Sequence, residues 1–335
     1  MGNGTLTIAV FNETASWVLP DEHVSRIERE APDGVVVRQV MNRTDLVRAL
    51  PETDYLFGFP LTEELVMHHA PKLKWAQMTN SPGDALAPVL AALRRGVRIS
   101  SAASIRAPQV AEHAVALVLA LMRRLDVAIR TQDEHRWATY EIAAEIRTLM
   151  GSTAGIIAVG AVGQEIAQRL KAFGVQILAT RRNPGNPYLH VDEMLGADEL
   201  PELLRRSDVV IVATPKLPTT MGLIGKKELA LMKPTAVLVD VSRGGVVNDA
   251  ALLEALRRRR IGGAGLDVFA SGPLPTDSPW WTMPNVIVTP HVASASPGYW
   301  SHASEVLTLN LKRLVEERAL VDEVTLEWLE NGSVA

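Results

Sequence analysis

The sequence predicts an α/β protein of two domains, each built on a doubly wound parallel sheet. Two observations predict this class. Short apolar runs alternate with helical patterns along most of the chain, and the alternation begins afresh near Gly151. The length of 335 residues also exceeds what one small hydrophobic core organises.

Four apolar runs in the first part of the chain are typical of strands: 6–11, 35–40, 54–59 and 74–79. Helical patterns follow the second and third of these runs, at 44–50 and 62–69. A longer helix is predicted over 109–125. This helix is apolar nearly all round, so we expect it to be buried on more than one side, and a subunit interface is one way to bury it.

The second block carries six further strand-like runs: 154–159, 175–180, 208–214, 236–242, 264–269 and 285–291. A last helix, about 301–317, is expected to return to the first domain. The second domain would then be an insertion, with residues 1–105 plus 297–335 in one domain and 106–296 in the other. Hinges are expected near 103–106 and 293–297.

Composition excludes several classes of function. A net charge of -4 gives no general attraction to nucleic acid or to an anionic membrane. The absence of cysteine excludes disulfides, thiolate metal sites and cysteine nucleophiles, and it fits a cytoplasmic protein. The N-terminus lacks the pattern of a secretory signal, and the apolar run 114–122 is shorter than the about 20 residues of a membrane span. We expect no metal ion in the site.

The segment 154–163 joins a strand to a helix and resembles the dinucleotide fingerprint G-x-G-x-x-G, with Ala158 at the first position and Gly160 and Gly163 at the others. Gly160 allows close approach of a pyrophosphate, and Gly163 allows tight helix packing. The N–H groups of Ala161 and Val162 would face the phosphates. The segment predicts a Rossmann nucleotide-binding domain, the alternative being a strand–turn–helix without nucleotide.

The next strand ends with Thr180, Arg181 and Arg182, where an acid that binds the adenosine ribose is usual. Because no carboxylate is present, an arginine is available for a 2′-phosphate. This favours NADP(H) over NAD(H), with NAD(H) still possible. The alternative is two exposed arginines beside a permissive pocket.

Three longer segments carry a family resemblance: 151–170, 231–256 with its SRGG motif, and 263–269 with GLDVF followed by 284–296 with TPH. Together with 73–79 and 110–125, in this order, they resemble the D-isomer-specific 2-hydroxyacid dehydrogenases, including glyoxylate/hydroxypyruvate reductases. The resemblance implies a Rossmann domain inserted into a flavodoxin-like substrate domain.

The resemblance also implies roles. Arg243 would hold the substrate carboxylate and carbonyl oxygen with its planar guanidinium, and His291 would donate the proton. Asp267 would face the nicotinamide side of the cofactor. Taken alone, an arginine after a strand would more often be a surface residue, and a histidine near a strand end would more often be structural. Further cofactor-binding positions would line the cleft: Thr214, Pro215, Thr220, Val241 and Ser242.

Two departures from the family pattern concern the substrate. Gly272 stands where a glutamate normally orients the catalytic histidine. In the loop that normally holds the carboxylate, Pro82 replaces a glycine and has no N–H to donate. The neighbouring Asn80, Ser81 and Gly83 are therefore expected to bind substrate. Arg106, at the expected hinge, could supply charge to the substrate, with a surface or phosphate-contact role as the alternative. Trp281 would wall an apolar pocket, with packing at the domain edge as the alternative.

Three functions remain open at this point. The first is NAD(P)H-dependent reduction of a 2-oxo acid to a D-2-hydroxy acid. The second is a dehydrogenase of a different small substrate, and the third is a dinucleotide-binding sensor with weak or no turnover. The apolar helix and the resemblance favour a homodimer whose other partner is a small-molecule acid.

Overall fold

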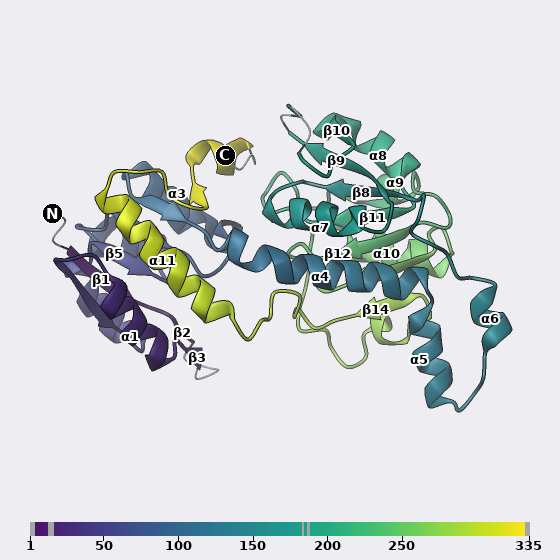
Figure 1. Ribbon diagram of the computed structural model, residues 1–335, viewed down its shortest axis with the longest axis horizontal. Coiled ribbons are helices and arrows are strands. Elements are labelled where there is room, and N and C mark those ends of the chain that lie inside the picture. Colours follow the sequence, from purple (N-terminus) through teal and green to yellow (C-terminus); the bar gives the residue numbers. More distant parts are fainter. Residues whose placement is uncertain (1–3, 13–16, 183, 186–187, 332–335) are drawn as a thin grey trace. The chain divides into compact units, whose positions relative to one another are not determined.

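The computed structural model describes residues 4–12, 17–182, 184–185 and 188–331. The chain divides into two units, the first made of residues 1–105 and 296–335 and the second of residues 106–295. These limits lie within one residue of the expected ones. Figure 1 colours both units along the chain.

The first unit contains a six-stranded sheet in which all neighbours but one are parallel. In spatial order the strands are β15 (Glu323–Val324), β7 (Arg98–Ser100), β6 (Trp75–Gln77), β5 (Tyr55–Phe57), β1 (Gly4–Ile8) and β4 (Val35–Gln39). The five parallel strands follow the flavodoxin-like order 2-1-3-4-5. The sequence did not predict β7 or the antiparallel β15.

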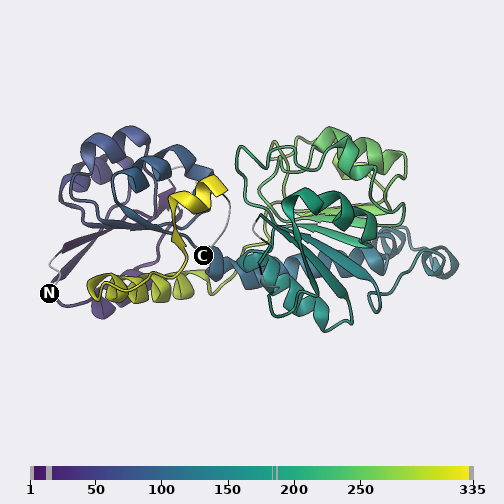
Figure 2. The same ribbon diagram turned by 90° about the horizontal axis from the view of Figure 1, so that it is seen from above.

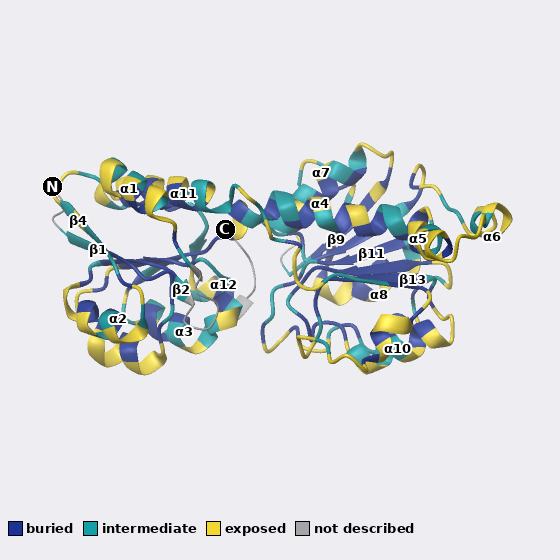
Figure 3. Ribbon diagram, turned by 90° about the horizontal axis from the view of Figure 1, so that it is seen from below, coloured by how far each residue is buried: buried dark blue, intermediate teal, exposed yellow. Residues whose placement is uncertain are grey.

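Helices cover both faces of this sheet, as Figures 2 and 3 show. One face carries α1 (Asp21–Glu30) and α11 (Tyr299–Val315), and the other carries α2 (Arg43–Ala49) and α3 (Leu86–Arg94). Trp75 and Leu307 are fully buried in the core between sheet and α11. The last helix therefore returns to the first unit, as predicted.

Smaller elements complete the first unit: the hairpin β2 (Phe11–Asn12) and β3 (Trp17–Val18), the short turns η1 (Leu50–Glu52), η2 (Leu65–His69) and η3 (Pro82–Ala85), and α12 (Leu326–Asn331). The helical pattern predicted at 62–69 is realised mostly as η2, which has π-helical geometry.

The second unit contains a seven-stranded sheet that is parallel throughout. Its spatial order is β10 (Glu193–Gly196), β9 (Gln176–Arg181), β8 (Thr153–Ile157), β11 (Val209–Val212), β12 (Val237–Asp240), β13 (Gly263–Leu266) and β14 (Val286–Val288). The first six strands have the Rossmann order 3-2-1-4-5-6, which reverses between β8 and β11. The sequence missed β10, a short edge strand.

Both faces of this sheet are buried, so successive residues of one strand enter different cores. Val209 and Ile211 pack with α4 (Ala103–Met122) and α7 (Ala161–Lys171), whereas Val210 and Val212 pack with helices of the other face. That face carries α8 (Leu200–Arg206), α9 (Lys226–Leu229) and α10 (Asp249–Arg257), beside the turns η4 (Ala197–Glu199) and η5 (Pro279–Thr282).

Helix α4 begins six residues before the predicted start and continues through Pro108. Proline lacks the N–H that would bond one turn back, so Pro108 removes one hydrogen bond from the helix. The first turn is stabilised from outside instead, because Asp322 accepts hydrogen bonds from both the N–H and the hydroxyl of Ser104. In the described chain, α4 alone is long and apolar enough to cross a membrane, yet Ala114 and Val118 are fully buried in the core, as a core helix requires.

A helical hairpin follows α4, made of α5 (Leu125–Asp133) and α6 (Thr139–Ala143). Figure 1 shows it extending away from the sheet of the second unit. Arg130 anchors its base by donating hydrogen bonds to the carbonyls of Met283, Pro284 and Val286.

Candidate active site

The expected cofactor and catalytic residues of the second unit follow the carboxyl ends of its parallel strands. Because all seven strands run the same way, these residues share one edge of the sheet. Open α/β sheets bind ligands at this edge, near the point where the strand order reverses.

The turn between β8 and α7 has the geometry of a phosphate site. Ala158 has a φ of 70°, a left-handed conformation that favours glycine. A Cβ at Gly163 would lie 3.0 Å from the Ala158 carbonyl oxygen, which explains the glycine there, whereas a Cβ at Gly160 would meet nothing within 4 Å. The N–H groups of Ala161 and Val162 lie in the first turn of α7, where they have no acceptor within the helix. Open space beside helix-end donors suits a pyrophosphate.

The next two strand ends flank this turn. The hydroxyl oxygen of Thr180 accepts a hydrogen bond from the N–H of Ala158 at 3.2 Å. This bond ties the turn between β8 and α7 to strand β9. The Arg181 guanidinium lies 5.3 Å from the ring centroid of Tyr188, and Arg182 donates to the Thr219 hydroxyl at 2.7 Å. Arg182 is thereby tied to the loop after β11.

The loop after β11 holds the predicted Thr214, Pro215 and Thr220. Thr214 donates to the Ile157 carbonyl at the end of β8, and Thr220 donates to the Pro215 carbonyl at 2.7 Å. Both threonines are buried. In this structure their hydroxyls fix the loop that flanks the phosphate turn.

The turn after β12 presents Arg243. Val241 and Ser242 are buried, while Arg243 is half-buried and donates to the Ser242 carbonyl at 3.0 Å. Gly244 has a φ of 73°, and a Cβ there would lie 1.9 Å from the Phe269 carbonyl oxygen. The glycine therefore lets this turn pack directly on the loop after β13.

The turn after β14 presents His291, which is exposed and has a φ of 56°. The backbone N–H of His291 donates to the backbone carbonyls of Asp267 and Thr289, each at 3.0 Å. The buried Asp267 carboxylate accepts the N–H groups of Val292 and Ala293, also at 3.0 Å. The family resemblance implied that Asp267 faces the cofactor. In this structure, hydrogen bonds to Asp267 hold the backbone of the turn that carries His291.

Asp240 is a further acid at this edge that the sequence did not single out. It ends β12, is 2% exposed, and accepts the Ser242 N–H at 2.9 Å. Burial raises the pKa of the Asp240 carboxyl from 3.8 to about 6, and the nearby Asp249 and Asp267 carboxylates add to the rise. Burying this charge opposes folding at neutral pH.

We expect Asp240→Asn to stabilise the protein at pH 8 but hardly at pH 4. Because the pKa is higher in the folded state, wild-type stability falls as the pH rises from about 4 to about 6 and stays low above that window. A rise of about two units corresponds to roughly 3 kcal/mol, of which about 1–2 should be recovered because the buried amide also needs partners. Denaturant unfolding at both pH values measures this, with the exposed Asp277→Asn as control. A less stable Asp240→Asn at pH 8 would show that the charge itself is needed.

The predicted substrate residues are divided between the units. Asn80, Ser81 and Gly83 follow β6 in the first unit, where Pro82 begins η3 and the Ser81 N–H donates to the Asp84 carboxylate at 3.1 Å. The Asn80 side-chain oxygen is buried without a hydrogen bond from the described residues. In this loop, the side-chain oxygen of Asn80 is thus a buried acceptor, and the N–H of Ser81 is a donor that already has a partner. The substrate-binding role of its residues stays a prediction.

The second unit holds the other two predicted substrate residues. Arg106 lies half-buried in α4. Trp281 lies in η5, is 49% exposed, and donates from its indole to the Pro275 carbonyl at 2.8 Å, whereas its neighbour Trp280 packs against Phe269 in the core. The packing interpretation holds for Trp280, and the role of Trp281 stays a prediction.

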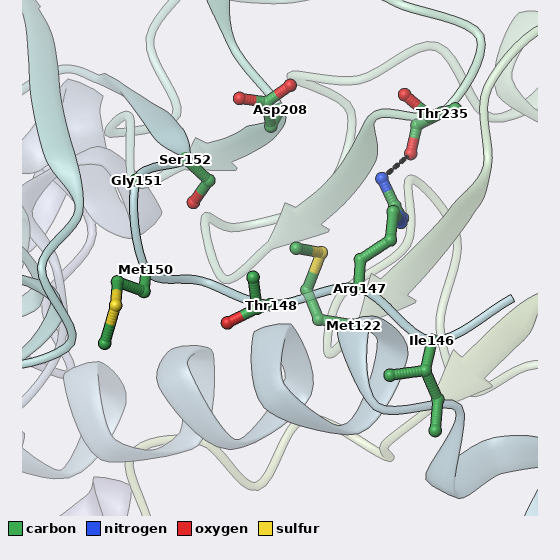
Figure 4. A pocket seen from close by; sticks show the side chains of 9 residues that line it. All are labelled: Met122, Ile146, Arg147, Thr148, Met150, Gly151, Ser152, Asp208 and Thr235. Carbon is green, nitrogen blue, oxygen red and sulfur yellow. Dashed lines mark hydrogen bonds between the residues drawn. The ribbon is translucent and has the colours of Figure 1, made fainter. Parts of the chain in front are cut away.

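A pocket of about 450 Å³ lies at the opposite edge of the same sheet (Figure 4). Ser152, Asp208 and Thr235 line it, and they precede β8, β11 and β12. Arg147 points toward Thr235 and donates to its carbonyl, and burial lowers the pKa of this guanidinium. Because the predicted residues follow the strands, this pocket is separate from the candidate active site. Within the described residues, no cluster of three or more histidine or acidic side chains is arranged to hold a metal ion.

The chain was compared with known proteins. Residues 115–293, just over half of the chain, match the family described as D-isomer specific 2-hydroxyacid dehydrogenase, NAD binding domain. A glyoxylate reductase of Thermococcus gammatolerans is 35% identical over 293 residues, which cover 85% of this chain and 83% of that protein.

A D-3-phosphoglycerate dehydrogenase of Mycobacterium tuberculosis is 37% identical over 272 residues, which cover 79% of this chain. The chain spans about half the length of that relative. Among solved structures, a D-isomer specific 2-hydroxyacid dehydrogenase from Xanthobacter autotrophicus, in complex with NADPH and MES, has a TM-score of 0.79 and 27% identity, with 96% of this chain and 98% of that chain covered.

The matched family residues include the phosphate turn, the β12 turn with Arg243 and the β14 turn with His291, and the fold is the one that the resemblance implied. The nucleotide that such a domain binds is a nicotinamide dinucleotide. The chain belongs to the D-isomer-specific 2-hydroxyacid dehydrogenase family.

Proposed function

We propose that the protein reduces a 2-oxo acid to a D-2-hydroxy acid with a nicotinamide dinucleotide. One observation carries the proposal: the turns after β12, β13 and β14 are fastened to one another, with Gly244 packed on the Phe269 carbonyl and the His291 N–H bonded to the Asp267 carbonyl. A guanidinium and an imidazole are thereby presented at the ligand-binding edge, on the two turns that flank the turn after β13. Family membership and the name of the Thermococcus relative support the same reaction class.

The proposed chemistry divides between cofactor and protein. A nicotinamide dinucleotide, held by the turn between β8 and α7, would supply the hydride that the carbonyl carbon receives. His291 donates a proton to the carbonyl oxygen, so that the C=O group becomes CH–OH. Arg243 holds the carboxylate beside that carbon, because two parallel N–H donors fix its orientation.

The function is tested by following nicotinamide absorbance with NADPH or NADH against a panel from glyoxylate through hydroxypyruvate to phenylpyruvate. Oxidation of NADPH or NADH in the presence of any of these acids supports the proposal. Tight cofactor binding without turnover across the panel would instead indicate a sensor, which the absence of a side chain at Gly272 would explain.

We propose that NADP(H) is the preferred cofactor. Arg181 ends β9 and Arg182 follows it, and the sequence from 179 to 185 contains no carboxylate that would repel a 2′-phosphate. Losing one charge-assisted contact costs about 1.5–3 kcal/mol, so Arg182→Ala should raise KM for NADPH about tenfold to a hundredfold and leave KM for NADH unchanged. Arg205→Ala, on the exposed side of α8, is the matched control. Equal effects on both cofactors would contradict the preference.

We propose that the protein is a homodimer and that the α5–α6 hairpin contributes to the interface. Helix α4 is largely covered by its own unit, whereas the hairpin leaves Trp137 and Tyr140 94% and 91% exposed, beside Ile129 at 61%. Large apolar side chains exposed on one element are a feature of interaction surfaces. Sedimentation velocity should show a dimer that Trp137→Glu with Ile129→Glu dissociates, and a monomeric wild-type protein would overturn the proposal.

A further inference from the structure

A chain of polar groups runs from α4 to the turn that carries His291. The His113 Nε2 atom lies 2.8 Å from the Thr289 hydroxyl oxygen, and this oxygen lies 2.6 Å from Oδ1 of Asp267. His113 Nε2 is itself 3.5 Å from the same carboxylate oxygen. The Asp267 side chain is 1% exposed and that of His113 is 22% exposed, so the chain is largely shielded from water.

The chemistry of the groups fixes the direction of these hydrogen bonds. An ionised carboxylate only accepts, and Asp267 already accepts the N–H groups of Val292 and Ala293. The Thr289 hydroxyl must therefore donate to Asp267, and its oxygen is left to accept. His113 then donates from Nε2 to Thr289, which places a proton on Nε2.

The Asp267 carboxylate, at the end of this series of hydrogen bonds, determines the position of His291. The left-handed conformation of His291 costs of order 1 kcal/mol, and such a conformation persists only where its surroundings hold it. Both Asp267 oxygens bond the two amides that directly follow His291. Orientation of the carboxylate therefore sets the backbone that aims the imidazole.

We propose that His113 is a positioning residue for His291, acting through Thr289 and Asp267. Its function is to orient the Asp267 carboxylate, and it touches neither substrate nor cofactor in this role. The catalytic consequence rests on the proposed reductase function, whereas the effect on the His291 turn does not.

The first test measures amide hydrogen exchange of Val292 and Ala293, which needs no turnover. His113→Leu removes the donor, and His113→Gln keeps an N–H at a similar reach. We expect about tenfold faster exchange at both amides in His113→Leu, since one lost hydrogen bond is worth up to about a factor of ten, and near wild-type exchange in His113→Gln. His190→Leu is the control, because His190 shortly precedes β10. Strands β10 and β14 are the two outermost strands of the sheet, so β10 is the strand farthest from the one that leads to His291.

The second test is kinetic. His113→Leu should lower kcat about tenfold while KM for the 2-oxo acid and Kd for NADPH stay within about twofold, because misplacement of a catalytic group affects the reacting step. Thr289→Val should lower kcat at least as much, and the double variant should match Thr289→Val, since both changes break one chain.

The outcomes are distinguishable. Unchanged exchange in His113→Leu, or the same exchange in His113→Leu and His113→Gln, overturns the positioning role. So does a double variant whose losses multiply. If the wild-type protein turns over no 2-oxo acid, the proposed reductase function fails, and the exchange measurement still decides whether His113 holds the turn.

Discussion

Arg243→Ala is expected to lower kcat/KM for a 2-oxo acid by about a thousandfold. The guanidinium can offer two parallel N–H donors to the substrate carboxylate, and losing such a charge-assisted pair costs about 4 kcal/mol. Arg243 is half-buried on the turn after β12, which Gly244 packs onto the loop after β13, so the guanidinium is presented by a fixed backbone. Initial rates across substrate concentrations measure the effect.

Two variants sharpen this prediction. Arg243→Lys keeps the charge but not the planar fork, and we expect it to recover only part of the loss. Arg258→Ala removes an arginine that pairs with Glu254 at the exposed end of α10, and it should leave kcat/KM unchanged. If Arg243→Ala kept kcat/KM within tenfold but weakened NADPH binding, Arg243 would be a cofactor contact and not the substrate anchor.

The alternation of apolar runs predicted ten strands, and it placed the centres of these strands better than their ends. The predicted runs 208–214, 236–242 and 285–291 pass the observed ends of β11, β12 and β14 by two or three residues. The overrun residues are Thr214, Val241, Ser242 and His291, among others. Thr214, Val241 and Ser242 are buried at the ligand-binding edge although they no longer form sheet ladders, whereas His291 is exposed there.

Other features depend on contacts distant in sequence and leave no local pattern. Helix α4 continues through Pro108 because Asp322, more than two hundred residues away, holds its first turn. The edge strands β10 and β15 are too short to show a period. Local sequence patterns report local preferences, and these elements are set by tertiary partners.

The residues of the candidate site also divide into those that the sequence predicted and those that only the structure revealed. Arg243 and His291 were predicted because they lie in motifs at strand ends. His113 is one polar position on an apolar helix and Asp240 is one acid inside an apolar strand, so neither stands out until the structure shows what surrounds it. A buried polar residue within an apolar run was the only signal available for both.

The strained turn at Ala158 shows that a departure from a motif need not remove the feature. The fingerprint places glycine there, and the structure keeps the glycine-like φ of 70° with alanine. The N–H of Ala158 bonds Thr180, and its carbonyl accepts the Gly160 N–H at 3.2 Å. Neighbouring hydrogen bonds therefore hold a conformation that the residue itself disfavours.

His291→Ala is expected to lower kcat for reduction by about a hundredfold to ten-thousandfold, the usual contribution of a positioned proton donor. The wild-type rate of reduction should fall as the pH rises, because His291 must carry a proton to donate it. The variant should lose this dependence, since water would then supply the proton. Measuring kcat from pH 5 to pH 10 for both proteins checks the two expectations together.

Gly272→Glu restores the glutamate that, by the family resemblance, orients the catalytic histidine. A Cβ at Gly272 would meet no atom within 4 Å, so the first atom of a side chain has room there. A carboxylate close to the protonated imidazole favours its charged form, and the alkaline limb of the pH profile should move up by about one to two pH units. Gly272→Gln adds similar bulk without charge and should leave the limb in place. A limb that moves equally in both variants, or that survives in His291→Ala, would mean that another group donates the proton.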